Sequence, residues 1–157
     1  MEMPLTERLG LHVKRVEQEL MAAKHAALRP LGLTVPQYVA LYTIGEHPGV
    51  SAAALARACL VTPQTIATVL TNLETKGLIA RQPHPWHRKV TEVRLTDEGR
   101  DLLGRADARA VAIERRIADG FSVEERDLLI DLLARASSRL TAEPSSEPPE
   151  DGSQGRA

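Results

Sequence analysis

Residues 62–79, TPQTIATVLTNLETKGLI, constrain the fold more than any other stretch, because they predict one helix with a marked start and end. Thr62 is a suitable N-cap, and Pro63 suits the first helical position, whose N–H would have no helical partner. Gly77 stands where a left-handed C-cap is expected. Apolar residues recur at helical spacing and predict a buried face: Ile66, Val69, Leu70 and Leu73.

The opposite face of this predicted helix carries short, uncharged side chains instead of the usual Glu and Lys: Gln64, Thr65, Thr68, Thr71, Asn72 and Thr75. One interpretation is a solvated helix that is rich in threonine. The other is a face that approaches a second polar surface closely. The base edges of DNA are such a surface, since Gln and Asn pair with adenine and the Thr methyl can touch a thymine methyl.

The residues before this helix predict a helix-turn-helix. Residues 51–59 form a short predicted helix with Ser51 as N-cap and Leu55 facing inward, and a short turn follows. Two helices in tandem, the second with a polar face, are typical of a motif whose second helix enters the major groove of DNA.

The residues after it predict two short strands, at 79–82 and 90–95, the second with alternating side chains. Two prolines in residues 83–89 exclude regular structure there, so this segment is a predicted hairpin loop. Arg88 and Lys89 give the loop a basic tip. A hairpin in this position is the wing of a winged helix, and a basic tip suits the negative minor groove.

Two helices are predicted N-terminal to this motif, at Pro4–Arg29 and at residues 34–47, where Thr34 and Gln37 have the spacing of a capping box. The first helix carries a narrow apolar stripe: Leu9, Val13, Val16, Leu20, Ala23 and Ala27. Such a stripe needs a partner, which is either the helix's own domain or a second subunit.

Two more helices are predicted at residues 97–119 and 122–140, the second with Ser122 and Glu125 as a capping box. The last helix has a clear apolar stripe: Leu128, Leu129, Leu132, Leu133, Ala136 and Leu140. Residues 141–157 hold Glu, Pro, Ser and Gly without apolar anchors, and we expect them to be a disordered acidic tail.

Composition sets limits on the class of protein. The chain has 157 residues, a formal net charge of −1 and one cysteine, so it has no internal disulfide framework. Residues 51–100 hold seven Lys or Arg against four Asp or Glu, which places a modest basic surplus around the polar-faced helix. We see no signal peptide and no apolar run that would span a bilayer, so a cytoplasmic protein without a membrane partner is expected.

Three runs of the sequence, LTVPQYVALYTI, SAAALARACLVTPQTIATVLTNLETKGLIAR and VTEVRLTDEGRDLL, resemble the MarR family of transcriptional regulators. The resemblance implies a mainly α fold of the α+β winged-helix type, with long N- and C-terminal dimerisation helices. The MarR-type domain would be residues 1–140, with the winged helix at about 34–98 and the dimerisation helices at about 4–29 and 97–140. It also implies a homodimeric repressor on double-stranded DNA, bound to a pseudo-palindrome with half-sites about 10 bp apart.

Site residues follow from the predicted interface and from this resemblance. The expected DNA contacts are Ser51, Thr62, Pro63, Gln64, Thr65, Thr68, Asn72, Lys76, Arg88 and Lys89. Many family members carry Asp-x-Arg in the wing, whereas this chain has His87 and Lys89, so phosphate or shape contact is expected there. Members often bind small aromatic ligands, and by position His12, Tyr38 and Tyr42 would line such a pocket or else serve as core or interface residues.

Other candidate sites have weaker patterns. Cys59 is expected to be a packing residue, because the family's peroxide-sensing cysteines usually lie in the first helix. His84 and His87 lack a neighbouring Cys or carboxylate cluster and predict no metal site, and no cofactor is expected. Trp86 either packs the loop onto the body or rests against DNA.

Two other functions remain as alternatives. The low net charge and the altered wing motif favour a winged-helix module that binds protein without binding DNA. An enzyme has the least support, since we find no phosphate loop, paired carboxylates or nucleophile elbow.

Overall fold

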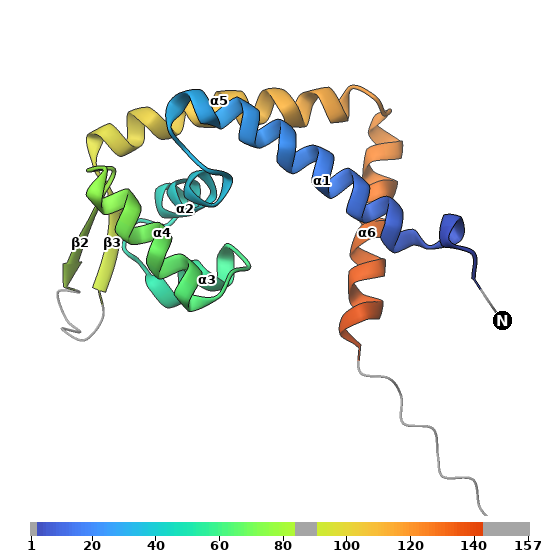
Figure 1. The fold of residues 1–157 in the computed structure, drawn as a ribbon, viewed down its shortest axis with the longest axis horizontal. Coiled ribbons are helices and arrows are strands. Elements are labelled where there is room, and N and C mark those ends of the chain that lie inside the picture. Colours follow the sequence, from blue (N-terminus) through green and yellow to red (C-terminus); the bar gives the residue numbers. More distant parts are fainter. Residues whose placement is uncertain (1–2, 84–90, 143–157) are drawn as a thin grey trace, which may run out of the picture. The chain divides into compact units, whose positions relative to one another are not determined.

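The computed structural model describes residues 3–83 and 91–142 and confirms the mainly α winged helix-turn-helix (Figure 1). Residue contacts group the chain into two compact units, Met1–Arg116 and Ile117–Ala157, which are described separately. The elements in chain order are η1 Leu5–Glu7, α1 Leu9–Leu28, η2 Arg29–Leu31, α2 Val35–Glu46, β1 Val50–Ser51, α3 Ala52–Ala58, α4 Pro63–Thr75, β2 Ile79–Pro83, β3 Thr91–Leu95, α5 Asp97–Ala118 and α6 Val123–Thr141.

Short polar side chains start the helices as the sequence predicts. The hydroxyl oxygens of Ser51, Thr62 and Ser122 accept hydrogen bonds from the backbone N–H three residues on, at 3.1–3.2 Å. Thr34 and Gln37 form the predicted capping box, and so do Ser122 and its partner Glu125. Each cap satisfies N–H groups that have no partner inside the helix, so these helix starts are encoded locally.

The N-terminal helix differs from its predicted limits. Arg8 has an extended backbone (φ −78°, ψ 111°), so the predicted helix Pro4–Arg29 is divided into η1 and α1. The ladder of α1 begins where the Leu11 N–H donates to the Arg8 carbonyl. No side chain caps the start of α1, and apolar periodicity alone does not reveal such a break.

The sheet has the order β1-β3-β2 with antiparallel pairing, and β3 lies in the middle. Val93 of β3 pairs with Val50 on one side and with Arg81 on the other. The two-residue strand β1 was not predicted, because two residues are too few to show alternation. The sequence predicts Pro83 in the loop, but it ends β2, a place where an edge strand tolerates proline.

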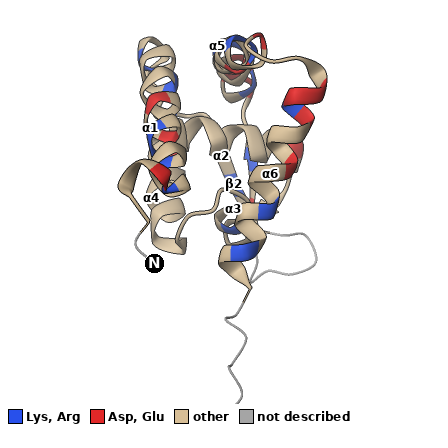
Figure 2. Cartoon of the chain, turned by 90° about the vertical axis from the view of Figure 1, so that its right-hand side faces the viewer, with Lys and Arg blue, Asp and Glu red and all other residues tan. Residues whose placement is uncertain are grey.

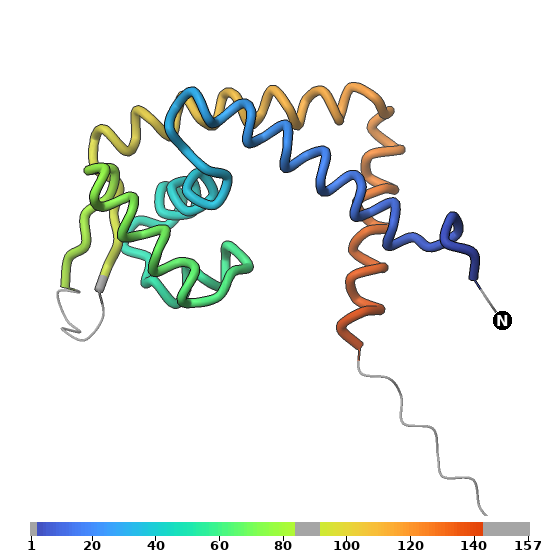
Figure 3. The backbone as a smooth tube through the Cα atoms, in the orientation of Figure 1, coloured from blue at the N-terminus to red at the C-terminus, as the bar shows by residue number. Residues whose placement is uncertain are grey.

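The core of the first unit lies around α2 and the buried face of α4. Its largest side chains, with less than 2% of their surface exposed, are Leu28, Leu41, Ile44, Leu55, Leu70, Leu73 and Val93. All four residues predicted for the inner face of α4 are buried. The backbone bends by 110° between α3 and α4 (Figure 3), through Leu60, which has a positive φ of 54° and a side chain that is 92% exposed.

The second unit contains α6, whose acidic residues lie in its first half together with Arg126, whereas Arg135 and Arg139 lie in its second half (Figure 2). Acidic residues occupy the first turn and Arg139 the last turn, which suits the helix dipole. The predicted apolar stripe is exposed in the single chain, with Leu128 at 58% and Leu133 at 47%.

Within the described ranges, no single helix is both long and apolar enough to cross a membrane. The pair α3 and α4 meets that test by length and composition, but only when the two bent helices are taken together.

Candidate nucleic-acid interface

The outward face of α4 is the polar face that the sequence predicted. Gln64, Thr68 and Asn72 are exposed, as are Thr65 and the two residues at the helix start, Thr62 and Pro63. The buried side chains on the opposite face fix the rotation of α4 about its axis, so the polar face is held toward solvent.

The threonine hydroxyls of α4 bond to the helix itself. Thr68 Oγ1 donates to the Gln64 carbonyl at 3.2 Å, Thr71 Oγ1 to the Ala67 carbonyl at 3.0 Å, and Thr75 Oγ1 to the Thr71 carbonyl at 2.9 Å. At the helix start, the hydroxyl oxygens of Thr62 and Thr65 lie 2.8 Å apart and share a hydrogen bond. The hydroxyl hydrogens of Thr68, Thr71 and Thr75 are therefore already used, and Thr62 and Thr65 together keep one.

Two of the predicted phosphate contacts have roles inside the fold. Ser51 caps α3, and Lys76 Nζ donates to the Gly32 carbonyl at 2.7 Å and to Gln37 Oε1 at 3.2 Å. Lys76 thereby ties the end of α4 to the start of α2. Its contact with phosphate stays a prediction, and it would compete with these two bonds.

Arg81 is a residue of this surface that the sequence interpretation missed. It lies on β2, where its Nε pairs with Glu74 Oε2 at 3.0 Å and its Nη2 donates to Thr71 Oγ1 at 3.3 Å. The available signal was an arginine in the strand that directly follows the polar-faced helix. Arg88 and Lys89, with His84, Trp86 and His87, lie outside the described residues.

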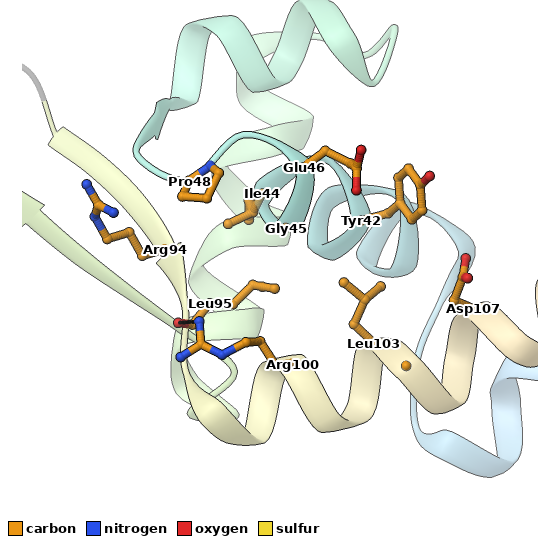
Figure 4. A pocket seen from close by; sticks show the side chains of 11 residues that line it. Tyr42, Ile44, Gly45, Glu46, Pro48, Arg94, Leu95, Arg100, Leu103 and Asp107 are labelled. Atoms are coloured by element: carbon orange, nitrogen blue, oxygen red, sulfur yellow. Dashed lines mark hydrogen bonds between the residues drawn. The ribbon is translucent and has the colours of Figure 1, made fainter.

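A cavity of about 530 Å³ lies between α2, β3 and the first half of α5 (Figure 4). Arg94, Leu95 and Arg100 stand at one end, and Tyr42 and Asp107 at the other, with Leu103 between them. Ile44, Gly45, Glu46, Pro48 and Gly104 complete the lining. Its size is in the range of small-molecule sites, and it combines apolar walls with a few charged groups.

One of the three predicted ligand residues lines this cavity, and a second lies next to the first. Tyr42 lines it, and the rings of Tyr38 and Tyr42 lie 6.3 Å apart between centroids. Tyr38 Oη donates to Asp107 Oδ1 at 2.8 Å, and burial together with this acidic partner raises the pKa of the Tyr38 phenol. His12 is not one of the lining residues; its Nε2 lies 3.1 Å from the Thr6 carbonyl oxygen.

Cys59 lies at a second, smaller cavity, of about 210 Å³, behind the start of α4. Its thiol contacts Thr43 Oγ1 at 3.8 Å, and burial raises the pKa of the thiol. The residue is packed against the core, which supports the expected packing role. Across the described ranges, no three His, Cys, Asp or Glu side chains form a group suited to a metal ion.

Comparison with known proteins supports a DNA-binding regulator over a module that binds only protein. The sequence pattern of the MarR family matches residues 31–89. The HTH-type transcriptional repressor Rv2887 of Mycobacterium tuberculosis is 41% identical over 109 residues, which cover 69% of this chain and 78% of that protein. The chain belongs to the MarR family. It is a DNA-binding transcriptional regulator, and the alternative of a winged-helix module that binds only protein finds no support among these relatives.

Solved structures of MarR regulators share the fold. CouR of Rhodococcus jostii, solved on a 23-mer DNA duplex, matches with a TM-score of 0.78 and 27% identity over 87% of this chain and 99% of its own. Rv2887 in complex with p-aminosalicylic acid matches with a TM-score of 0.65 and 35% identity over 83% of this chain and 98% of its own.

Proposed function

We propose that this MarR regulator is a repressor that binds a pseudo-palindromic operator as a homodimer and leaves it when an aromatic acid binds. The observation that carries the proposal is the capped helix α4, whose exposed face of neutral polar side chains stands opposite a buried apolar face. Uncharged donors and acceptors on a rigid helix suit base edges, and a relative of the same fold was solved on duplex DNA.

In this proposal α4 reads the major groove with Gln64, Thr65, Thr68 and Asn72, and Thr62 and Pro63 approach it at the helix start. Ser51, which caps α3, is proposed to contact a phosphate with its side chain. Arg88 and Lys89 of the wing supply phosphate or minor-groove contacts. Lys76 would join them only by giving up its bonds to the η2–α2 junction.

The homodimer is supported by apolar surface that the single chain leaves exposed. In the first half of α1 and just before it, Leu5, Leu9 and Val16 expose 60%, 74% and 59% of their surface. In α6, Leu128 and Leu132 expose 58% and 41%. Apolar stripes of this kind on long helices are typical of an interface between subunits.

The effector site is proposed at the cavity between α2, β3 and α5. Leu95 and Leu103 offer apolar walls to a ring, and Tyr42 offers an aromatic side chain. Arg94 and Arg100, which pair with Glu92 and Asp97, would share their guanidinium groups with a ligand carboxylate. Rv2887 was solved with p-aminosalicylic acid, which has this chemistry. Tyr38 would act beside the cavity through Asp107, and His12 would reach it only from a second subunit.

A regulator of this kind acts where the chromosome is, so the proposal places the protein in the cytoplasm. Fluorescence anisotropy with the duplex upstream of its own gene, at two salt concentrations and with random duplex as competitor, tests DNA recognition. Tight binding that random duplex does not displace, lost on adding p-aminosalicylate, is the expected result. Binding shared equally with random duplex would contradict operator recognition, and binding unaffected by any aromatic acid would contradict the effector site.

A further inference from the structure

Four exposed residues form the line on α4 directly opposite its buried face: Gln64, Thr68, Thr71 and Thr75. Their spacing of four, three and four residues keeps them on one side of the helix. Because a recognition helix enters the groove with its N-terminal part, Gln64 and Thr68 are placed to meet bases first, and Thr71 follows on the same side of the helix.

A threonine side chain has two branches, a hydroxyl and a methyl. Thr68 and Thr71 turn their hydroxyls back to the carbonyls of Gln64 and Ala67, at 3.2 and 3.0 Å. This bond uses the hydroxyl hydrogen, so neither residue has a donor left for a base or a phosphate. The methyl is the apolar branch that remains to contact another surface, and the hydroxyl oxygen of Thr68 can only accept a hydrogen bond.

The hydroxyl group of Thr71 makes two hydrogen bonds, one as donor and one as acceptor. It donates to the Ala67 carbonyl and accepts from Arg81 Nη2 at 3.3 Å, while Glu74 holds the same arginine at 3.0 Å. The Glu74–Arg81 pair therefore fixes the rotamer of Thr71. A fixed hydroxyl fixes the methyl on the same carbon.

We infer that the γ-methyl groups of Thr68 and Thr71 bind the C5 methyl groups of thymines, so that α4 selects thymine by apolar contact under its outward face. The inference rests on the proposed approach of α4 to the major groove. The thymine methyl is the one apolar group on a base edge there, and threonine methyls are known partners for it. Gln64 and Asn72 make no side-chain hydrogen bond to the described residues, so their amides are available for adenine.

The two kinds of contact point to one base pair. An A·T pair presents the adenine N7 and N6 groups and the thymine methyl in the same groove. A helix face of free amides and threonine methyls is therefore matched to A·T pairs, and Arg81, the arginine beside this face, is held by Glu74 and Thr71.

Deoxyuridine tests the inference, because it removes the thymine methyl and keeps the base pairing and the O4 acceptor. Duplexes that the wild-type protein selects from a randomised library are remade with deoxyuridine at single thymine positions, and their affinities are measured by anisotropy. We expect a loss of about fourfold at each contacted position, the effect of one methyl group removed from an apolar contact. Deoxyuridine at thymine positions outside the DNA segment that the protein covers should leave the affinity unchanged and serves as the internal control.

A matched set of variants assigns the contact to the methyl. Thr68→Ser keeps the hydroxyl and should bind thymine and deoxyuridine duplexes equally at its position, whereas Thr68→Val keeps the methyl and should retain the preference. Thr43→Ser is the control, because Thr43 makes the same bond to the carbonyl four residues back, at 2.9 Å, in α2.

The outcomes separate the inference from the function on which it rests. A wild-type protein that selects no sequence overturns operator recognition and the inference with it. Selection of a sequence with equal affinity for thymine and deoxyuridine overturns the inference alone. A preference that survives in Thr68→Ser and Thr71→Ser, or is lost in Thr68→Val, also overturns it, since the hydroxyl would then carry the contact.

Discussion

Tyr38 Oη donates a hydrogen bond to Asp107 Oδ1 at 2.8 Å, which joins α2 to α5 across 69 residues of sequence. A second pair joins α1 to α5, where Lys24 Nζ lies 2.6 Å from Glu114 Oε1. Arg109 also donates to the Ala27 carbonyl at 3.1 Å. Polar bonds within the first unit thus fix α5 against α1 and α2, and one of the bonded residues, Asp107, lines the proposed effector cavity.

Replacing Tyr38 by Phe should lower the free energy of unfolding by about 1 kcal/mol, because the half-buried Asp107 loses its donor while the ring remains. Urea unfolding followed by circular dichroism, at one fixed protein concentration, measures this change. Tyr42→Phe is the matched control, because its hydroxyl makes no hydrogen bond within the described residues. Equal losses for the two variants would contradict a specific role of the Tyr38–Asp107 bond.

Two glycines of α5 should respond oppositely to alanine. A Cβ at Gly99 would collide with the carbonyl oxygen of Leu78, whereas a Cβ at Gly104 would meet nothing within 4 Å. Gly99→Ala should therefore destabilise the protein by about 1–3 kcal/mol, since the backbone must shift. Gly104→Ala should stabilise it by up to about 1 kcal/mol, because alanine is the better helix former. Thermal melts of both variants show whether each substitution lowers or raises the stability. A Gly99→Ala protein as stable as the wild type would show that α5 can move away from Leu78.

Replacing Gln64 by Ala should weaken the selected operator by about 1–3 kcal/mol and relax the preference at one base pair, as loss of a base contact does. The measurement compares selected and random duplexes at the same salt concentration. An equal loss on both duplexes would exclude a base-reading role for Gln64.

Lys89→Ala should instead weaken all duplexes alike. The slope of log affinity against log salt concentration should become shallower by about one, because one phosphate contact is lost. Titrations at four salt concentrations measure the slope for variant and wild type. An unchanged slope would place Lys89 away from phosphate.

Lys76→Met keeps the apolar stem of the side chain and removes the two bonds of its ammonium to Gly32 and Gln37. We expect a loss of stability of about 0.5 kcal/mol with an unchanged salt slope for DNA binding, because the charge is engaged within the fold. Urea unfolding and the salt titration are made on the same sample. A slope that falls by about one would assign Lys76 to phosphate instead.

The thiol of Cys59 should ionise at a higher pH than a solvent-exposed thiol, since burial raises its pKa. A raised native pKa favours the neutral thiol, so this contribution to stability is complete below the unfolded pKa of about 8.5 and is lost as the pH rises through the native value. The rate of iodoacetamide alkylation against pH should have its midpoint at a higher pH in native than in urea-unfolded protein. Cys59→Ser is the blank, and coincident midpoints would show that folding leaves the thiol unperturbed.

Local chemistry in the sequence determined where most helices begin and which face of each is apolar. Thr34, Ser51, Thr62 and Ser122 cap the helices they were expected to cap, since a cap needs only a short polar side chain and the backbone three residues on. The polar face of α4 followed from the same periodicity that predicted its buried face. The family followed from runs of residues that lie in these elements.

Tertiary structure decided what could not be read from spacing. Strand β1 exists because Val50 meets Val93, and Lys76 meets Gly32 only after the chain has folded across 44 residues. The cavity brings together residues of α2, β3 and α5, and Arg81 becomes part of the α4 surface only because β2 returns beside that helix. These relations depend on distances between separate segments, and packing sets such distances, whereas periodicity and capping act within one segment.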